Sequence, residues 1–448
     1  MTTHKKRLMG AGAMLAAAAF ALAGCSSGGS SKEATGAAEA TTSDGQVVEL
    51  TYMHRLQDAE GMTKVADIVS RWNKEHPNIQ VKTVKFDGAA QDMIQKLETD
   101  VKAGNAACLA QVGYAEVPEV YTKGLLEDVT QYAEKYKDNF SEGEYNLMGV
   151  DGKIFGLPQD TGPLVYFYDT EAFKQLGIEV PTNAEELEAA AKKAAAQGKY
   201  ILSFQADEAG NALTAQAAAA GDSWFTLDGD AWKVNTTGTG STAVADVWQN
   251  LLDNKAVFTK PRWDASWSAA VADGSLIGTI GAAWEAPLIA GDGANSADAG
   301  KWAVAELPNW FGNADGATGP DGGSGVAVMK GCQYPAEAME FNNWFNTQVD
   351  DLATQGLVTA ASTSVPATPD SYGPFFAAGE DPMTVFSKAS ANMSSKFIFM
   401  PGWSSVTPVM TDKANAAIDG SAKVADVFSS AGDQAKTTLK DLGLQVAN

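Results

Sequence analysis

The stretch Gln46-Val-Val-Glu-Leu-Thr-Tyr-Met53 begins the part of the chain from which the fold class can be inferred. Its apolar and polar residues alternate, which is typical of a β-strand. After a short polar loop, apolar residues from Met62 to Trp72 recur at helical spacing, and Pro77 stops this pattern. Ile79 to Val84 alternates again, so the pattern predicts strand, helix, strand.

The same order continues in the next thirty residues or so. Ile94, Leu97 and Val101 share one helical face, and Gly104 follows as a helix-ending residue. Ala107 to Val112 predicts a third strand. Strands that alternate with helices predict an α/β sheet whose strands are joined by crossover helices.

Further elements of both kinds are predicted later in the chain. Thr182-Asn183-Ala184-Glu185 has the spacing of a capping box and predicts a helix that extends to about Gln197. Short apolar stretches predict strands over 163–168, 276–283 and 325–329. A helix is expected to begin at Pro335.

Three segments marked by glycine or proline divide these patterns, and we expect the chain to cross between two lobes there. They are 159–162, 319–323 and 366–369. The sequence is long enough for two lobes with separate cores. The expected first lobe contains 45–159 and 319–366, and the second contains 160–318 and 367–448.

The N-terminus has the features of an export signal, with Lys5, Lys6 and Arg7 followed by an apolar run that is short for a membrane span. The run ends Leu22-Ala-Gly-Cys25, which looks like the lipobox of bacterial lipoproteins. We therefore expect a signal peptide over 1–24, a lipid on Cys25 and a flexible linker over 25–44, which is rich in Ser, Gly, Ala and Thr. The alternative is ordinary signal cleavage that leaves Cys25 free.

Charge and cysteine content exclude several classes of partner. The formal net charge of −23 argues against nucleic acid, because an acidic chain repels phosphate backbones. Cys108 and Cys332 are the cysteines that remain after Cys25, too few for a zinc cluster. In an oxidising compartment they either form a disulfide or stay as two separate thiols. No cofactor is expected.

The chain has little of what most enzymes need. After the signal it contains two histidines, His54 and His76, and no phosphate-binding P-loop. We therefore expect neither a catalytic metal nor a nucleophile with its base. Paired carboxylates of a glycoside hydrolase stay open as an alternative, with Glu116, Asp160 and Glu285 as the residues to consider.

Aromatic and polar residues at the ends of predicted strands favour a binding protein. Trp224, Trp284 and Trp403 each lie beside a turn or at a strand end, where an exposed indole could stack on the apolar face of a sugar ring. Side chains that hydrogen-bond to hydroxyl groups occupy comparable positions: His54, Arg55, Gln57, Gln91, Tyr114, Glu116, Gln159 and Asp160. The alternative for each is an ordinary loop, cap or core residue.

Several motifs together resemble the extracellular solute-binding proteins of family 1, which serve ABC importers of sugars and oligosaccharides. The resemblance covers nearly the whole chain, and single motifs are weakly specific. Besides the lipobox, the motifs include Trp72-Asn-Lys-Glu-His-Pro77, Val112-Gly-Tyr-Ala-Glu116, Asp151-Gly-Lys-Ile-Phe-Gly-Leu-Pro-Gln-Asp160, Gly281-Ala-Ala-Trp284, Gly322-Gly-Ser-Gly325 and Pro401-Gly-Trp403. The loop after the first strand departs from the family pattern, which leaves the particular sugar open.

The resemblance implies a two-lobed α/β fold of the periplasmic-binding-protein type II, with lobes that are joined by several crossings and close on the ligand. It implies a non-enzymatic, monomeric protein at the outer face of the membrane, with an oligosaccharide ligand and permease subunits as partners. The alanine-rich sequence, with its two inner cysteines, favours a Gram-positive cell. Its ligand residues would be those named above together with Glu285 and Gly323. The rivals are a binder of another solute, such as a peptide, polyamine or glycerophosphodiester, and a surface-anchored glycoside hydrolase.

Overall fold

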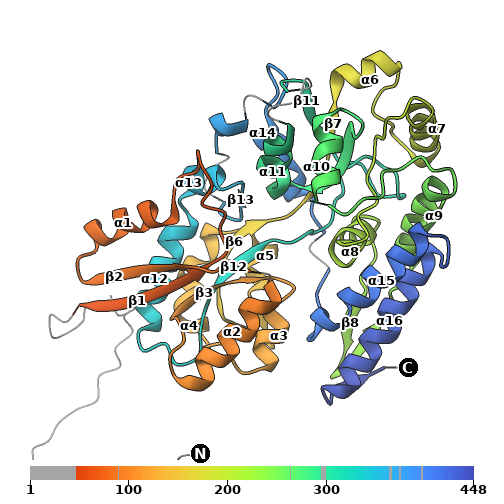
Figure 1. Cartoon of the computed structure of the whole chain (residues 1–448). Helices are drawn as coiled ribbons and strands as arrows, with labels where there is room; N and C mark the ends of the chain where they lie inside the picture. The colour runs from red at the N-terminus through yellow and green to blue at the C-terminus, as the bar shows by residue number, and fades with distance from the viewer. Residues whose placement is uncertain are drawn as a thin grey trace, which may run out of the picture. The chain divides into compact units, whose positions relative to one another are not determined.

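The strand–helix repeat near the N-terminus forms one side of a six-stranded sheet (Figure 1). In this computed structural model, residues 47–447 are described except for 89, 263, 294–298, 363–365, 373–374 and 395–396. Strand β1 (Val48–His54) is parallel to β2 (Ile79–Lys85) and to β3 (Leu109–Gly113). The connecting helices are α1 (Val65–Glu75) and α2 (Ala90–Ala103), as the sequence predicts.

The other half of this sheet comes from later parts of the chain and is antiparallel. Strand β12 (Ser324–Val328) lies between β3 and β6 (Gly156–Thr161), and β13 (Val358–Thr359) forms the edge. One face packs on α1 and α12 (Pro335–Asn346), and the other on α2 and α3 (Val117–Thr122). The disulfide Cys108–Cys332 joins the residue before β3 to the loop before α12, with 4.7 Å between the Cα atoms.

A second, three-stranded sheet is wholly antiparallel. Strand β7 (Leu164–Asp169) lies between β10 (Gly278–Ala282) and β11 (Trp302–Glu306). Leu164 and Tyr166 belong to one core, whereas Val165 and Phe167 belong to the core on the opposite face, so β7 is apolar on both faces.

Helices form most of the rest of this half of the molecule, shown in green and blue in Figure 1. The first of the two cores packs against α7 (Ala184–Ala195), α8 (Ala209–Ala219), α9 (Thr239–Asp253), α15 (Thr407–Ile418) and α16 (Val424–Asp441). The second packs against α10 (Ala265–Ala272), α11 (Ala286–Gly293) and α14 (Pro382–Ala391).

The remaining elements are short. A small sheet contains β8 (Phe225–Asp228), β9 (Ala231–Val234) and β14 (Gln445–Val446), and a hairpin contains β4 (Gly149–Val150) and β5 (Lys153–Ile154). The short helices are α4 (Thr130–Ala133), η1 (Glu134–Asn139), α5 (Glu142–Leu147), α6 (Thr170–Leu176), η2 (Ala283–Glu285), α13 (Val349–Thr354), η3 (Asp370–Tyr372) and η4 (Trp403–Ser405).

The chain passes between the six-stranded sheet and the β10–β7–β11 sheet from β6 to β7 and again from β11 to β12, and these two passages run side by side. The N–H of Asp321 donates to the carbonyl of Gly162 at 2.7 Å, and the N–H of Leu164 donates to that of Gly319 at 3.3 Å. A Cβ atom on Gly162 would lie 2.0 Å from the Asp321 carbonyl oxygen, so only glycine permits this approach. The third passage follows β13 and leads to α14.

The predicted elements named above are present with shifts of a few residues at their ends. One detail differs: Asn183, rather than Thr182, is the N-cap of α7, because its side chain accepts a hydrogen bond from the N–H of Glu186. The signal, Cys25 and the linker lie outside the described residues. Among residues that the structure describes, no helix combines the length and the hydropathy needed to cross a bilayer.

Candidate ligand-binding site

A cavity of about 410 Å³ is lined by residues from both halves of the molecule. Arg55, Gln57 and Glu116, which follow β1 and β3, form part of one wall. Trp284 and Glu208, which belong to the half built on the three-stranded sheet, form part of the opposite wall. The passage through Gly322, Gly323 and Ser324 contributes to the lining as well.

Arg55 and Glu116 form a two-pronged ion pair at the carboxyl ends of the parallel strands. Both guanidinium-to-carboxylate distances are 3.1 Å. The carboxylate also accepts the N–H of Gly113 at 2.9 Å, and the N–H of Arg55 donates to the side-chain oxygen of Gln111 at 2.7 Å. The pair cancels its own charge and leaves edges of both side chains in the cavity, which suits hydrogen bonds to hydroxyl groups.

Asp160 is a buried carboxylate at the end of β6. It accepts hydrogen bonds from the N–H of Ser324 at 3.0 Å and from its hydroxyl at 2.5 Å. Burial raises the pKa of Asp160 to about 7, and the two bonds from Ser324 act in the opposite direction. The hydroxyl of Tyr114 donates to the backbone carbonyl of Asp160 at 2.9 Å, so Tyr114 holds the backbone of this residue but is not itself part of the cavity lining.

Gly323 allows Tyr114 to take that position. Its φ of +85° is in the region that favours glycine, and a Cβ atom there would lie 2.8 Å from the Tyr114 ring. The N–H of Tyr114 donates to the Gly323 carbonyl at 3.2 Å. Gly323 therefore lines the cavity with its backbone and brings β3 close to the passage between the sheets.

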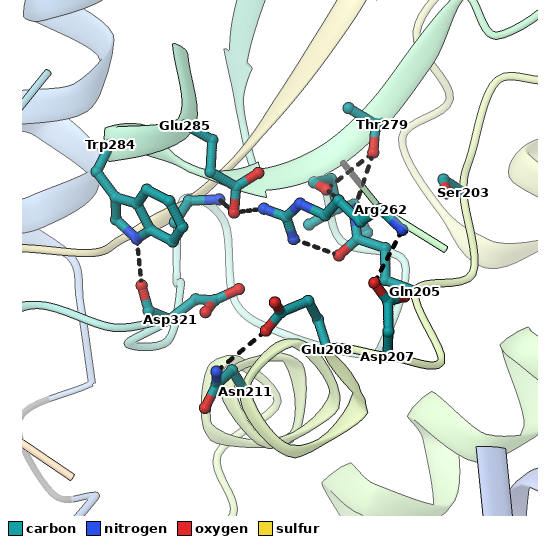
Figure 2. Close-up of polar contacts among 12 residues, drawn as sticks. Ser203, Gln205, Asp207, Glu208, Asn211, Arg262, Thr279, Trp284, Glu285 and Asp321 are labelled. Atoms are coloured by element: carbon teal, nitrogen blue, oxygen red, sulfur yellow. Dashed lines mark hydrogen bonds and ion pairs between the residues drawn. The ribbon is translucent and has the colours of Figure 1, made fainter. Parts of the chain in front are cut away.

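Trp284 offers a half-buried indole to the cavity from the short helix η2 (Figure 2). Its Nε1–H donates to the backbone carbonyl of Asp321 at 2.9 Å. Gly322 leaves room for this contact. A Cβ atom at this position would lie 3.1 Å from the indole nitrogen, which is a crowded distance. The ring is therefore held at one edge, and the apolar surface it offers suits stacking on a sugar.

The structure does not bring every predicted residue to the cavity. Glu285 is buried and forms an ion pair with Arg262, as Figure 2 shows. Gln159 is buried and donates to Tyr52 and Asn346. Gln91 and His54 also lie outside the cavity lining. Gln91 is half-buried at the start of α2. His54 is buried, and burial lowers its pKa to about 4.

The expectation that Trp224 and Trp403 are exposed is wrong. Trp224 is fully buried, Trp403 is 3% exposed, and their ring centroids lie 6.1 Å apart in the core beside β8. The Nε1–H of Trp224 donates to the hydroxyl of Ser241 at 2.9 Å. Each follows a turn in sequence, but its indole lies in the apolar core to which α9, α15 and α16 also contribute. Their expected ligand role is therefore not supported by their position.

Several residues of the lining were not predicted: Gln111, Glu208, Asn211, Ser324, Gln355, Leu357 and Phe399. Glu208 and Asn211 lie at the start of α8, and a hydrogen bond of 3.2 Å joins their side chains. An alanine-rich helix that is buried over almost its whole length carries no amphipathic pattern to mark it, so this wall was not apparent from periodicity. Within the described part of the chain, no cluster of three or more His, Cys, Asp and Glu residues could hold a metal.

The sequence matches the family model of bacterial extracellular solute-binding proteins over residues 67–384. A solved structure with a similar fold is the galacto-N-biose-/lacto-N-biose I-binding protein of an ABC transporter from Bifidobacterium longum, in complex with lacto-N-biose. It is 58% identical, with a TM-score of 0.87, and the match covers 90% of this chain and 100% of that one.

More distant relatives are also sugar binders by name. The binding protein from B. animalis subsp. lactis, in complex with β-1,6-galactobiose, is 23% identical with a TM-score of 0.73, and the match covers 90% of this chain and 100% of that one. The lactose-binding protein of Rhizobium radiobacter is 24% identical over 289 residues. That alignment covers 62% of this chain and 65% of the relative's length.

Proposed function

The chain belongs to the bacterial extracellular solute-binding proteins, and we propose that it captures a neutral oligosaccharide and delivers it to the permease of an ABC importer. It has the two-lobed α/β fold of the periplasmic binding proteins. The observation that carries the proposal is the 58% identity, over 90% of this chain, with a binding protein that holds lacto-N-biose. Lacto-N-biose and galacto-N-biose are therefore the first ligands to test.

The cavity lining supports a neutral sugar as the ligand. The Arg55–Glu116 pair, the Asp160 carboxylate and the amide of Gln111 offer donors and acceptors at one wall, and Trp284 offers an apolar ring at the other. Such a combination buries the apolar face of a sugar while its hydroxyl groups stay hydrogen-bonded. We expect the lobes, proposed as 45–159 with 319–366 and 160–318 with 367–448, to close on it.

The proposal includes a location. A lipid on Cys25, followed by the linker over 25–44, would hold a monomeric receptor near its permease at the outer face of the membrane, in a Gram-positive cell. Confinement of this kind raises the effective concentration of the receptor at its partner. Mass spectrometry of the membrane-extracted protein would detect the acyl chains on Cys25, and an unmodified cysteine in that protein would refute the anchor.

We propose that the protein binds its ligand without catalysis. Glu116 is engaged by Arg55 and Asp160 by Ser324, so the carboxylates of this wall are already used as hydrogen-bond acceptors. Incubation with lacto-N-biose, followed by chromatography of the mixture, should return the intact disaccharide. Release of monosaccharides by the purified protein, and not by a Glu116→Gln/Asp160→Asn variant, would favour the glycoside hydrolase instead.

Isothermal titration calorimetry tests the ligand class directly. Lacto-N-biose, galacto-N-biose and a panel of other oligosaccharides are titrated beside a peptide mixture, spermidine and a glycerophosphodiester. We expect heat with one or more of the glycans and none with the other solutes. Heat with spermidine or peptides alone would replace the sugar proposal by one of its rivals.

A further inference from the structure

Arg262 is a buried cation beside Glu285, the residue that follows Trp284 in the chain (Figure 2). It lies between α9 and α10 and is 5% exposed. One terminal nitrogen donates to the side-chain oxygen of Gln205 at 2.6 Å, and the other forms the ion pair with Glu285. The N–H of Arg262 donates to the carboxylate of Asp207 at 2.9 Å, so side chain and backbone are both held.

Through Glu285, Arg262 acts on the residue next to Trp284 in the chain. Glu285 is the last residue of η2, and its carboxylate also accepts the N–H of Ala282 at 3.1 Å. The carboxylate thereby spans the short turn that carries Trp284. Because Glu285 is 1% exposed, it depends on Arg262 for its counter-charge, and loss of that charge would force the turn to move or the carboxyl to take up a proton.

Asp321, which holds the indole by its backbone, is a second buried acid close to Arg262. The backbone carbonyl of Asp321 accepts the Nε1–H of Trp284 at 2.9 Å, and its N–H donates to Gly162 in the neighbouring passage at 2.7 Å. Burial raises the pKa of the Asp321 carboxyl; the positive charge of Arg262 acts to lower that pKa, and the negative charge of Glu208 adds to the rise. Figure 2 shows the side chains of Asp321 and Glu208 on the same side of the guanidinium.

We infer that Arg262 is a positioning residue for ligand recognition: it does not line the cavity, but its ion pair with Glu285 fixes the short turn that carries the Trp284 indole. Its positive charge also acts on the buried carboxyl of Asp321, whose backbone carbonyl accepts the indole N–H. The same contacts connect the indole to the passage between the sheets. The inference rests on the proposed function in so far as Trp284 contacts a bound sugar. Asp207 and Glu208 are the other acidic groups that face the guanidinium.

A double-mutant cycle with lacto-N-biose as the probe tests this coupling. We expect Arg262→Lys, which keeps the charge but loses the two-pronged geometry, to weaken binding about five- to fifty-fold. In a Trp284→Ala background the same change should cost less than two-fold, because the ring it positions is absent. Equal losses in both backgrounds would overturn the inference. Arg71→Gln, at a partly exposed ion pair with Asp351, is the matched control and should change neither affinity.

A measurement without ligand separates this inference from the proposed function. The indole N–H resonance of Trp284 is assigned by its loss in Trp284→Phe and compared between the wild-type protein, Arg262→Lys and Arg71→Gln. We expect the resonance to shift only in the Arg262 variant. An unshifted resonance would overturn the inference whether or not any glycan binds, whereas a shift in a protein that binds no glycan would count against the proposed function alone.

If Arg262→Lys does not fold, the paired variant Arg262→Gln/Glu285→Gln removes both buried charges and takes its place in both experiments. This pair leaves neither member of the ion pair unpaired in the interior, and Asp321, whose pKa burial already raises, can take up a proton. A Trp284 resonance at its wild-type position in the folded pair variant would show that the ion pair does not hold the indole. A displaced resonance, with a binding loss that vanishes in the Trp284→Ala background, would support the positioning role.

Discussion

Among the three tryptophans considered as ligand platforms, Trp284 has an indole that lines the cavity. Trp224 and Trp403 are buried in a core instead. Trp284→Ala should therefore weaken sugar binding by about 1–3 kcal/mol through the loss of stacked apolar area. Calorimetric titration measures this loss. Trp403→Phe is the control: it should lower the melting temperature and leave the affinity within two-fold. Unchanged affinity in a folded Trp284→Ala protein would remove the ring from the site.

Asp160 gives stability a dependence on pH that can be assigned to one side chain. The unfolded chain releases this proton near the ordinary pKa of 3.8, but the folded chain holds it until about pH 7. The unfolded state thus binds fewer protons between these values, and the contribution of Asp160 to stability falls as pH rises from about 4 to 7. His54, with its pKa lowered from 6.5 to about 4, acts in the opposite direction over much of this range.

Comparison of the wild-type protein with Asp160→Asn isolates that contribution. The asparagine keeps an acceptor for Ser324 but does not titrate. We expect its free energy of unfolding, relative to the wild type, to increase steadily between about pH 4 and pH 7 and then to level off. Denaturant titrations at half-unit pH steps measure the difference. A difference that is constant with pH would show that the Asp160 carboxyl is not held in its protonated form.

At the scale of elements, α3 and η4 are joined by a hydrogen bond between halves of the molecule. The hydroxyl of Ser404 in η4 donates to the carboxylate of Glu119 in α3 at 2.6 Å, and Glu119 is buried. This contact lies away from the passages between the sheets, so it stabilises the arrangement in which α3 and η4 are close. Ser404→Ala should disfavour that arrangement by about 1 kcal/mol.

If the closed, sugar-bound arrangement is the one in which α3 and η4 are close, a loss of about 1 kcal/mol should reduce sugar affinity about five-fold. The reduction should come chiefly from faster dissociation of the sugar. Stopped-flow displacement of lacto-N-biose measures the dissociation rate. Ser405→Ala is the adjacent control: its hydroxyl is engaged within the same half, with Gly402 and Thr438, and the dissociation rate should stay at the wild-type value. Equal dissociation rates for Ser404→Ala and the wild type would exclude a latch between α3 and η4.

At the scale of the whole molecule, the disulfide Cys108–Cys332 closes a loop with a sequence separation of 224. It joins the start of β3 to the segment after β12, two strands that are neighbours in the first sheet. A cross-link over so long a loop restricts the unfolded chain strongly, so the Cys108→Ser/Cys332→Ser variant should lose about 2–5 kcal/mol of stability.

The cavity is lined by residues at the opposite ends of these strands, so sugar affinity should stay within two-fold of the wild type at temperatures where the variant is folded. Chemical denaturation and calorimetry measure the two quantities separately. Stability that is equal with and without reductant in the wild-type protein would contradict a stabilising disulfide.

Local sequence was sufficient where a residue's environment follows from its neighbours in the chain. The parallel strands β1, β2 and β3 were predicted from alternation, because one period describes a whole strand. Arg55 and Glu116 were found because residues that follow parallel strands meet at one edge of the sheet. The helices α8, α15 and α16 were not predicted. Because residues of these helices share a core with Trp224 and Trp403, the burial of the two indoles was not predicted either.

By itself, the sequence determined the α/β class of the fold and the polar residues that follow β1 and β3, since each depends on a pattern within a few tens of residues. Only the tertiary structure decided which tryptophan faces the cavity, that Glu285 serves Arg262 rather than a ligand, and that Glu208 completes the wall. Those outcomes depend on contacts between segments far apart in the chain, and periodicity carries no information about such contacts.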